Sequence, residues 1–158
     1  MAPRFLPDYS FSMRRAAPVT LLALLACSGE PPTTRGVVDG RFTPCPDSPN
    51  CVSSDDSTRH AIPPLRLAES PSVVWPRVVA AIERMPRTTI VTHDSTYLHA
   101  EVRSRVFRFG DDMELHLRSA DRLIAIRSAA RLGRWDLGVN RRRVERLRRT
   151  LQADGVLR

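Results

Sequence analysis

Residues 106–129 read VFRFGDDMELHLRSADRLIAIRSA, and this stretch decides the fold of the chain. Apolar and polar side chains alternate on both sides of a short polar turn, which is typical of two strands joined in a hairpin. If Arg118 lies opposite Leu123, apolar side chains face apolar ones along the hairpin, and Glu114 faces Arg127. A slip of one residue would move every side chain to the opposite face. The pattern therefore predicts both the hairpin and its register.

The first strand of this hairpin, predicted over residues 106–118, has one apolar and one polar face. Strand geometry places alternate side chains on opposite faces, so Asp111 points away from Asp112. The side chains expected in the core are Phe107, Phe109, Met113, Leu115 and Leu117, and those expected on the other face are Asp112, Glu114 and His116.

The neighbouring segments predict two more strands and two helices. Strands are expected at residues 88–93 and 97–104, joined by a turn at Asp94-Ser95-Thr96. One helix is expected to include residues 75–85, with Pro76 in its first turn and Pro86 ending it. A second helix is expected from Asn140, as the N-cap, to Gln152.

These elements predict a single α+β domain over residues 41–158. Its small four-stranded antiparallel sheet carries both helices on one face. The first third of this domain, through Pro71, is rich in proline and is expected to be mostly irregular.

The basic residues of the chain are all arginine. The chain has 25 of them against 17 acidic residues, a net charge of +8, and it contains no lysine. It therefore cannot form a pyridoxal phosphate Schiff base or supply the lysine of a P-loop. No nucleophile elbow and no dinucleotide-binding glycine pattern occurs, so no cofactor is predicted. No aromatic stacking set accompanies the arginines, so no nucleic-acid partner is predicted either.

The N-terminus predicts export. Arg14 and Arg15 precede a short apolar run that ends Leu-Leu-Ala-Cys at Cys27, which resembles a bacterial lipobox. The resemblance implies a signal peptide over residues 1–26 and a lipidated Cys27, and Ser28 is typical of outer-membrane sorting. Residues 27–40 are expected to form a flexible tether. The alternative is an ordinary signal peptide with an incidental cysteine, and translation could start at either Met1 or Met13.

Lipidation of Cys27 would leave two cysteines for the exported domain. Cys45 and Cys51 flank a turn-forming segment, so a disulfide is predicted in the oxidising compartment. The rival interpretation is a metal site that adds His60, but zinc ligands usually lie closer together in the sequence. No metal site is predicted.

The acidic residues around Asp112 have two interpretations. Asp112 and Glu114 share a face, so with Arg127 they are the candidate catalytic residues of a hydrolase-like enzyme. The simpler interpretation is that Glu114 and Arg127 form a cross-strand ion pair.

The arginine-rich segment 127–143 predicts an anion site. Arginines in the first turn of a helix oppose its dipole, so they need an anionic partner. A phosphate or carboxylate bound near the helix N-terminus would meet this need, and the alternative is a structural network between Asp136 and the arginines. The candidate binding residues are Arg131, Asp136, Asn140, Arg141 and Arg142.

Four ordered motifs carry a resemblance to a known family. They are CPDSPNCVSS at 45–54, FGDDME at 109–114, RSAARLG at 127–133 and DLGVNR at 136–141. Together they are similar to domain-of-unknown-function family 1499 (DUF1499) over about residues 42–152. The resemblance implies the boundaries of a domain and no specific activity.

The sequence as a whole favours a binding protein over an enzyme. It predicts a lipid-anchored protein that faces the periplasm, at the outer membrane, and binds an anionic small molecule or lipid headgroup. The alternatives are the hydrolase described above and a structural partner of other envelope proteins.

Overall fold

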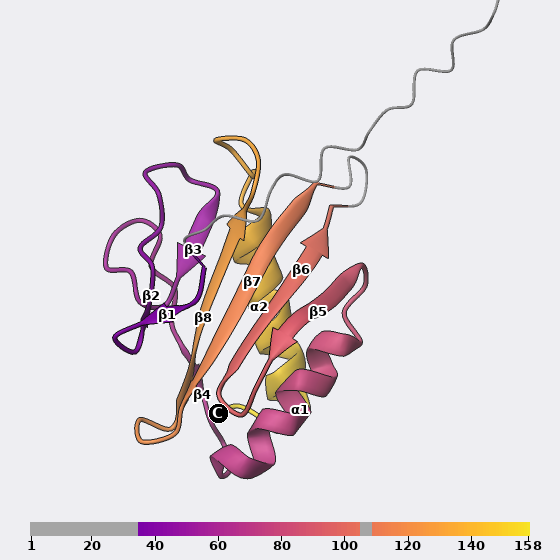
Figure 1. Cartoon of the computed structure of the whole chain (residues 1–158). Helices are drawn as coiled ribbons and strands as arrows, with labels where there is room; N and C mark the ends of the chain where they lie inside the picture. The colour runs from indigo at the N-terminus through magenta and orange to yellow at the C-terminus, as the bar shows by residue number, and fades with distance from the viewer. Residues whose placement is uncertain (1–34, 105–108) are drawn as a thin grey trace, which may run out of the picture.

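In the computed structural model, which describes residues 35–104 and 109–158, the predicted hairpin forms the centre of the main sheet (Figure 1). Strand β7 (Gly110–Arg118) pairs with β8 (Leu123–Ala130). Arg118 lies opposite Leu123 and Glu114 opposite Arg127, so the predicted register is confirmed. Val106 and Phe107, at the predicted start of this strand, lie outside the described residues. Phe109 was predicted in the core, but it precedes β7 and is exposed.

The two preceding strands also form where the sequence predicts them. Strand β5 (Thr88–His93) pairs with β6 (Tyr97–Arg103), which pairs in turn with β7. At the turn between β5 and β6, Asp94 Oδ1 accepts hydrogen bonds from the backbone N–H groups of Thr96 (2.7 Å) and Tyr97 (2.8 Å). The side chain of Asp94 thus closes the predicted turn.

The prediction of four strands was wrong, because the main sheet has six. Strands β3 (Cys51–Ser53) and β4 (Leu65–Arg66) both pair antiparallel with β8. The sheet order is β3-β8-β7-β6-β5, with β4 beside β8, and β1 (Val37–Val38) and β2 (Arg41–Phe42) form a separate pair. Strands of two or three residues are too short to show alternation, so the N-terminal segment looked irregular.

Both helices lie on one face of the sheet, as predicted (Figure 1). Helix α1 (Pro71–Glu83) contacts β5, and α2 (Val139–Ala153) contacts β8 and α1. The apolar core between the helices and the sheet includes Val74, Val78, Leu98, Leu115, Ile126, Val144 and Leu151. No described helix is long and apolar enough to cross a membrane.

The predicted starts of both helices need correction. Helix α1 begins at Pro71, where the missing N–H of proline costs nothing, and Pro76 lies inside it. Helix α2 is capped by Gly138, whose φ of 74° is accessible to glycine at little cost, and Asn140 lies within the first turn.

The opposite face of the sheet is covered by the N-terminal segment. The backbone N–H of Gly36 donates to Glu114 Oε1 (2.6 Å), and the ring of Phe42 packs edge-on against His116. The ordered chain therefore begins before residue 41, because Arg35 and Gly36 of the predicted tether contact side chains of the sheet. The disulfide between Cys45 and Cys51 is confirmed.

Candidate functional site: an arginine-lined pocket

A pocket of about 430 Å³ opens between the two helices and the end of β6. Its apolar floor is formed by Ala81 of α1, Val102 of β6 and Leu147 of α2, all of which are buried. Met85, Pro86 and Val139 extend the apolar lining. A cavity of this size and composition is typical of sites for small molecules.

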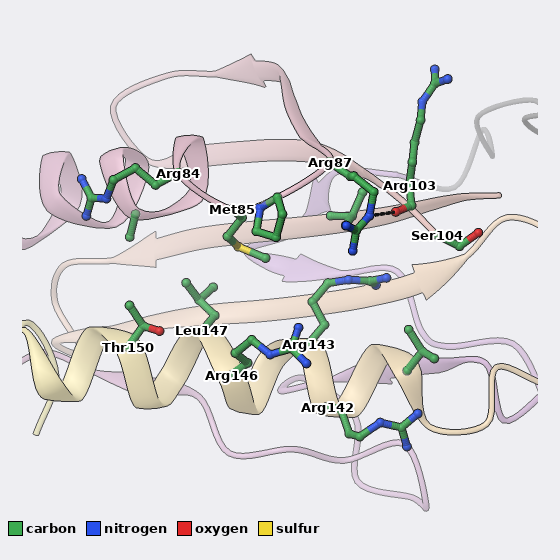
Figure 2. A pocket seen from close by; sticks show the side chains of 14 residues that line it. Arg84, Met85, Arg87, Arg103, Ser104, Arg142, Arg143, Arg146, Leu147 and Thr150 are labelled. Atoms are coloured by element: carbon green, nitrogen blue, oxygen red, sulfur yellow. Dashed lines mark hydrogen bonds between the residues drawn. The ribbon is translucent and has the colours of Figure 1, made fainter. Parts of the chain in front are cut away.

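Arginine residues line the pocket around this floor, although the side chain of Arg103 projects away from it (Figure 2). They come from the end of α1, from the start of β5 and the end of β6, and from the first half of α2. None of the described residues that line the pocket is acidic. The six arginines are Arg84, Arg87, Arg103, Arg142, Arg143 and Arg146.

Two of these six arginines are neutralised within the chain. Arg143 is buried and forms an ion pair with Asp111 of β7. Arg103 Nε lies 2.9 Å from Glu101 Oε1. Asp111 thus points toward the helices and away from Asp112, as strand alternation predicts.

The other four arginines form no ion pair with any described residue. Arg87 Nε donates to the backbone carbonyl of Arg103 (3.2 Å), and Arg142 Nη1 donates to that of Leu137 (2.7 Å). Arg84 and Arg146 are exposed to solvent. The pocket therefore combines an apolar floor with an excess of positive charge, which suits an anion that carries an apolar body.

The predicted anion site at the start of α2 is filled by the chain itself. Asp136 Oδ1 accepts from the backbone N–H of Gly138 (2.8 Å), and Oδ2 accepts from that of Asn140 (2.9 Å). A carboxylate at this position satisfies free N–H groups and complements the helix dipole. The side chain of Asn140 is buried and bonds to Asp136, Ser128 and the carbonyl of Asn50.

The predicted anion-binding arginines lie in three places. Arg142 lines the pocket, whereas Arg141 donates to the carbonyls of Ala61 and Arg59 (both 3.1 Å) on another part of the surface. Arg131 lies on the far face of the sheet, where it binds Asp112. The structure therefore does not bring Arg131, Arg141 and Arg142 together.

The candidate catalytic residues do lie together on the far face of the sheet. Arg127 Nη1 lies 2.9 Å from Glu114 Oε2, which confirms the predicted cross-strand ion pair. Asp112 accepts hydrogen bonds from His99 Nε2 (2.7 Å) and Arg131 Nη2 (2.7 Å). Both carboxylates are buried beneath the N-terminal segment, so a substrate could reach them only if that segment moved.

Burial and charge act in opposite directions on this cluster. Burial raises the pKa of Asp112, but hydrogen bonds from His99 and Arg131 outweigh it and hold that pKa at about 2. Burial and the charge of Glu114, which accepts a hydrogen bond from the Tyr97 hydroxyl (2.8 Å), raise the pKa of Tyr97 well above its ordinary value. Asp112 therefore stays ionised and Tyr97 stays neutral at physiological pH.

Of the six pocket arginines, only Arg142 was predicted as an anion-binding residue; the five that were not are Arg84, Arg87, Arg103, Arg143 and Arg146. Arg142 and Arg146 are four residues apart on a helix, so they share a face, and this spacing was an available signal. Nothing local in the sequence links them to Arg84 and Arg87, because that contact depends on how the two helices pack.

Comparison with known proteins identifies the family of the chain. Among the described residues, no group of histidine, cysteine and acidic side chains is arranged to hold a metal ion. No curated protein and no solved structure matches the chain. A family model described as "protein of unknown function (DUF1499)" matches residues 41–151, which include all six strands of the main sheet and most of α2. The chain therefore belongs to the DUF1499 family.

Proposed function

We propose that this chain is an exported, lipid-anchored envelope protein whose domain binds an amphiphilic anion in the arginine-lined pocket. The apolar run before Cys27 and the lipobox-like sequence support export and anchoring. The disulfide between Cys45 and Cys51 supports an oxidising compartment such as the periplasm.

One observation carries the binding proposal: four arginines without a described acidic partner surround an apolar floor. Guanidinium groups bind carboxylates and phosphates through paired hydrogen bonds, whereas the floor of Ala81, Val102 and Leu147 offers no polar side chain. The ligand class that satisfies both features is an alkyl or acyl chain that carries a carboxylate or phosphate head.

Binding of dodecyl phosphate, measured by isothermal titration calorimetry below its micelle concentration and at low salt, tests the proposal. The variants Arg84→Gln and Arg146→Gln each remove one positive charge from the rim of the pocket. We expect each to weaken binding about fivefold, as is usual when one partly exposed charged hydrogen bond is lost. Inorganic phosphate should bind far more weakly than dodecyl phosphate, because it cannot use the apolar floor.

Arg149→Gln is the matched control for this experiment. Arg149 is an exposed arginine on the same helix that does not line the pocket, so its removal changes the net charge equally. Equal weakening by Arg149→Gln and Arg146→Gln would mean that only the overall charge attracts the ligand. That result, or no binding by the parent chain, would refute the pocket.

A further inference from the structure

The segment between β8 and α2 exposes an unusual amount of apolar surface. Eight large apolar side chains are exposed among the described residues, and four of them lie within residues 132–139. Trp135 is 76% exposed and Leu137 is 84% exposed. We call residues 132–139 the Trp135 loop. The four exposed side chains are Leu132, Trp135, Leu137 and Val139.

The conformation of Leu137 makes its exposure more notable. Its φ is 52°, in the left-handed region that glycine and asparagine adopt far more readily than leucine. Arg142 holds this turn through a hydrogen bond to the Leu137 carbonyl. At this position leucine is neither buried nor in a favourable backbone conformation. A contact with a surface outside the chain would account for the presence of leucine here.

The charges around the Trp135 loop indicate what that contact is. Arg134, Arg141 and Arg142 are exposed in and beside the loop. The single acidic residue within the loop, Asp136, has both carboxylate oxygens turned to the start of α2. An exposed tryptophan and leucine among arginines match the boundary of an anionic bilayer, where indole rings and arginine side chains gather.

The position of the loop agrees with such a contact. Arg131, where the loop leaves the sheet, binds the same oxygen of Asp112 that lies 4.0 Å from Arg35 Nη1. Only eight peptide units separate Arg35 from Cys27, and at full extension they span at most about 29 Å. An anchor at Cys27 would therefore hold this end of the domain close to the membrane.

We infer that the Trp135 loop docks on an anionic membrane surface, with Trp135 and Leu137 entering the interface. The inference does not depend on what fills the arginine-lined pocket. It differs from anchoring through Cys27, because it specifies which face of the domain meets the lipid.

Tryptophan fluorescence tests this inference directly. The chain has two tryptophans, and Trp75 is buried in α1. In the full chain carrying Trp75→Phe, we expect vesicles that contain phosphatidylglycerol to shift Trp135 emission to shorter wavelength and brominated acyl chains to quench it. If Trp75→Phe perturbs folding, the difference between the parent chain and Trp135→Phe gives the same signal.

Two control variants separate docking from mere proximity. A tryptophan placed on the far edge strand by Val91→Trp, in a chain lacking Trp75 and Trp135, should stay unquenched, since Val91 is exposed on β5. Arg134→Gln should lower the ratio of chains with a membrane-docked Trp135 loop to chains with a free loop about fivefold. Arg149→Gln should leave this ratio unchanged. No quenching of Trp135, equal quenching at residue 91, or no difference between Arg134→Gln and Arg149→Gln would overturn the inference.

Discussion

At the scale of single residues, Asp112 is a carboxylate that is buried and yet charged. Desolvation alone would favour its protonated form, but His99 and Arg131 both donate hydrogen bonds to it. The strands set these contacts, because His99 lies on β6 and Arg131 directly follows β8. A charge held in this way stabilises the folded state only while the carboxylate remains ionised.

This arrangement predicts acid sensitivity. The fold lowers the pKa of Asp112 from the ordinary aspartate value of 3.8 to about 2. The pKa is lowered on folding, so the contribution is complete above pH 3.8 and is lost as the pH falls toward 2. We expect Asp112 to account for about 2 kcal/mol of the unfolding free energy across this window.

Urea unfolding at a series of pH values measures this contribution. Asp112→Asn should be less stable than the parent at neutral pH and should lose less stability on acidification. Asp121→Asn, which changes an exposed acid in the β7–β8 turn, should keep the slope of the parent. Parallel curves for the parent and Asp112→Asn would contradict the prediction.

At the scale of elements, helix α2 depends on a residue that lies before it. Asp136 satisfies N–H groups of the first turn, although Gly138 occupies the cap position. We expect Asp136→Ala to lower the unfolding free energy by about 1 to 2 kcal/mol, as the loss of a capping side chain usually does. Thermal unfolding of this variant measures the loss.

A matched variant at the other end of the helix gives the comparison. Asp154 is exposed at the C-terminus of α2, where a negative charge opposes the helix dipole. Asp154→Ala should therefore leave stability unchanged or raise it slightly. If Asp154→Ala lowered the unfolding free energy as much as Asp136→Ala does, Asp136 would act only through the net charge of the chain.

The predictability of the elements followed their length. Alternation over six residues or more gave β5 its correct bounds, and β6 was correct to within one residue. Strands β3 and β4 could not be predicted, because a pair or triplet of residues has no detectable period. The start of α1 was misplaced because Pro76, which fits a first turn, lies in the second.

At the scale of the whole molecule, both candidate sites depend on contacts between distant segments. The pocket joins residues 81–87, 102–104 and 139–150, so its arginines come together only after the helices pack. The ion pair of Glu114 and Arg127 was predictable from register alone. Its burial was not, because the covering residues 35–42 carried no periodic signal.

The disulfide contributes to the stability of the whole domain. Cys51 lies in β3 and pairs with Ala129 of β8, so the short loop closed with Cys45 is attached to the main sheet. Closure of such a small loop should be worth about 2 kcal/mol in the chain-entropy model. We expect reduction by dithiothreitol to lower the unfolding free energy by that amount.

The doubly substituted chain Cys45→Ser/Cys51→Ser provides the reference. Its stability should equal that of the reduced parent and should not respond to dithiothreitol. A parent chain whose urea midpoint is the same with and without reductant would contradict the predicted contribution.

The N-terminal segment that covers the sheet also determines which part of the domain would open first under a pulling force. In a chain anchored through Cys27, any tension between membrane and domain enters at Arg35 and first reaches the contacts of Arg35 with His99 and Asp112 and the hydrogen bond between Gly36 and Glu114. These contacts and the short β1–β2 pair would break before the long central strands separate, because they consist of few hydrogen bonds. Pulling would therefore expose the charged face of the sheet to water, while the pocket on the opposite side keeps its shape.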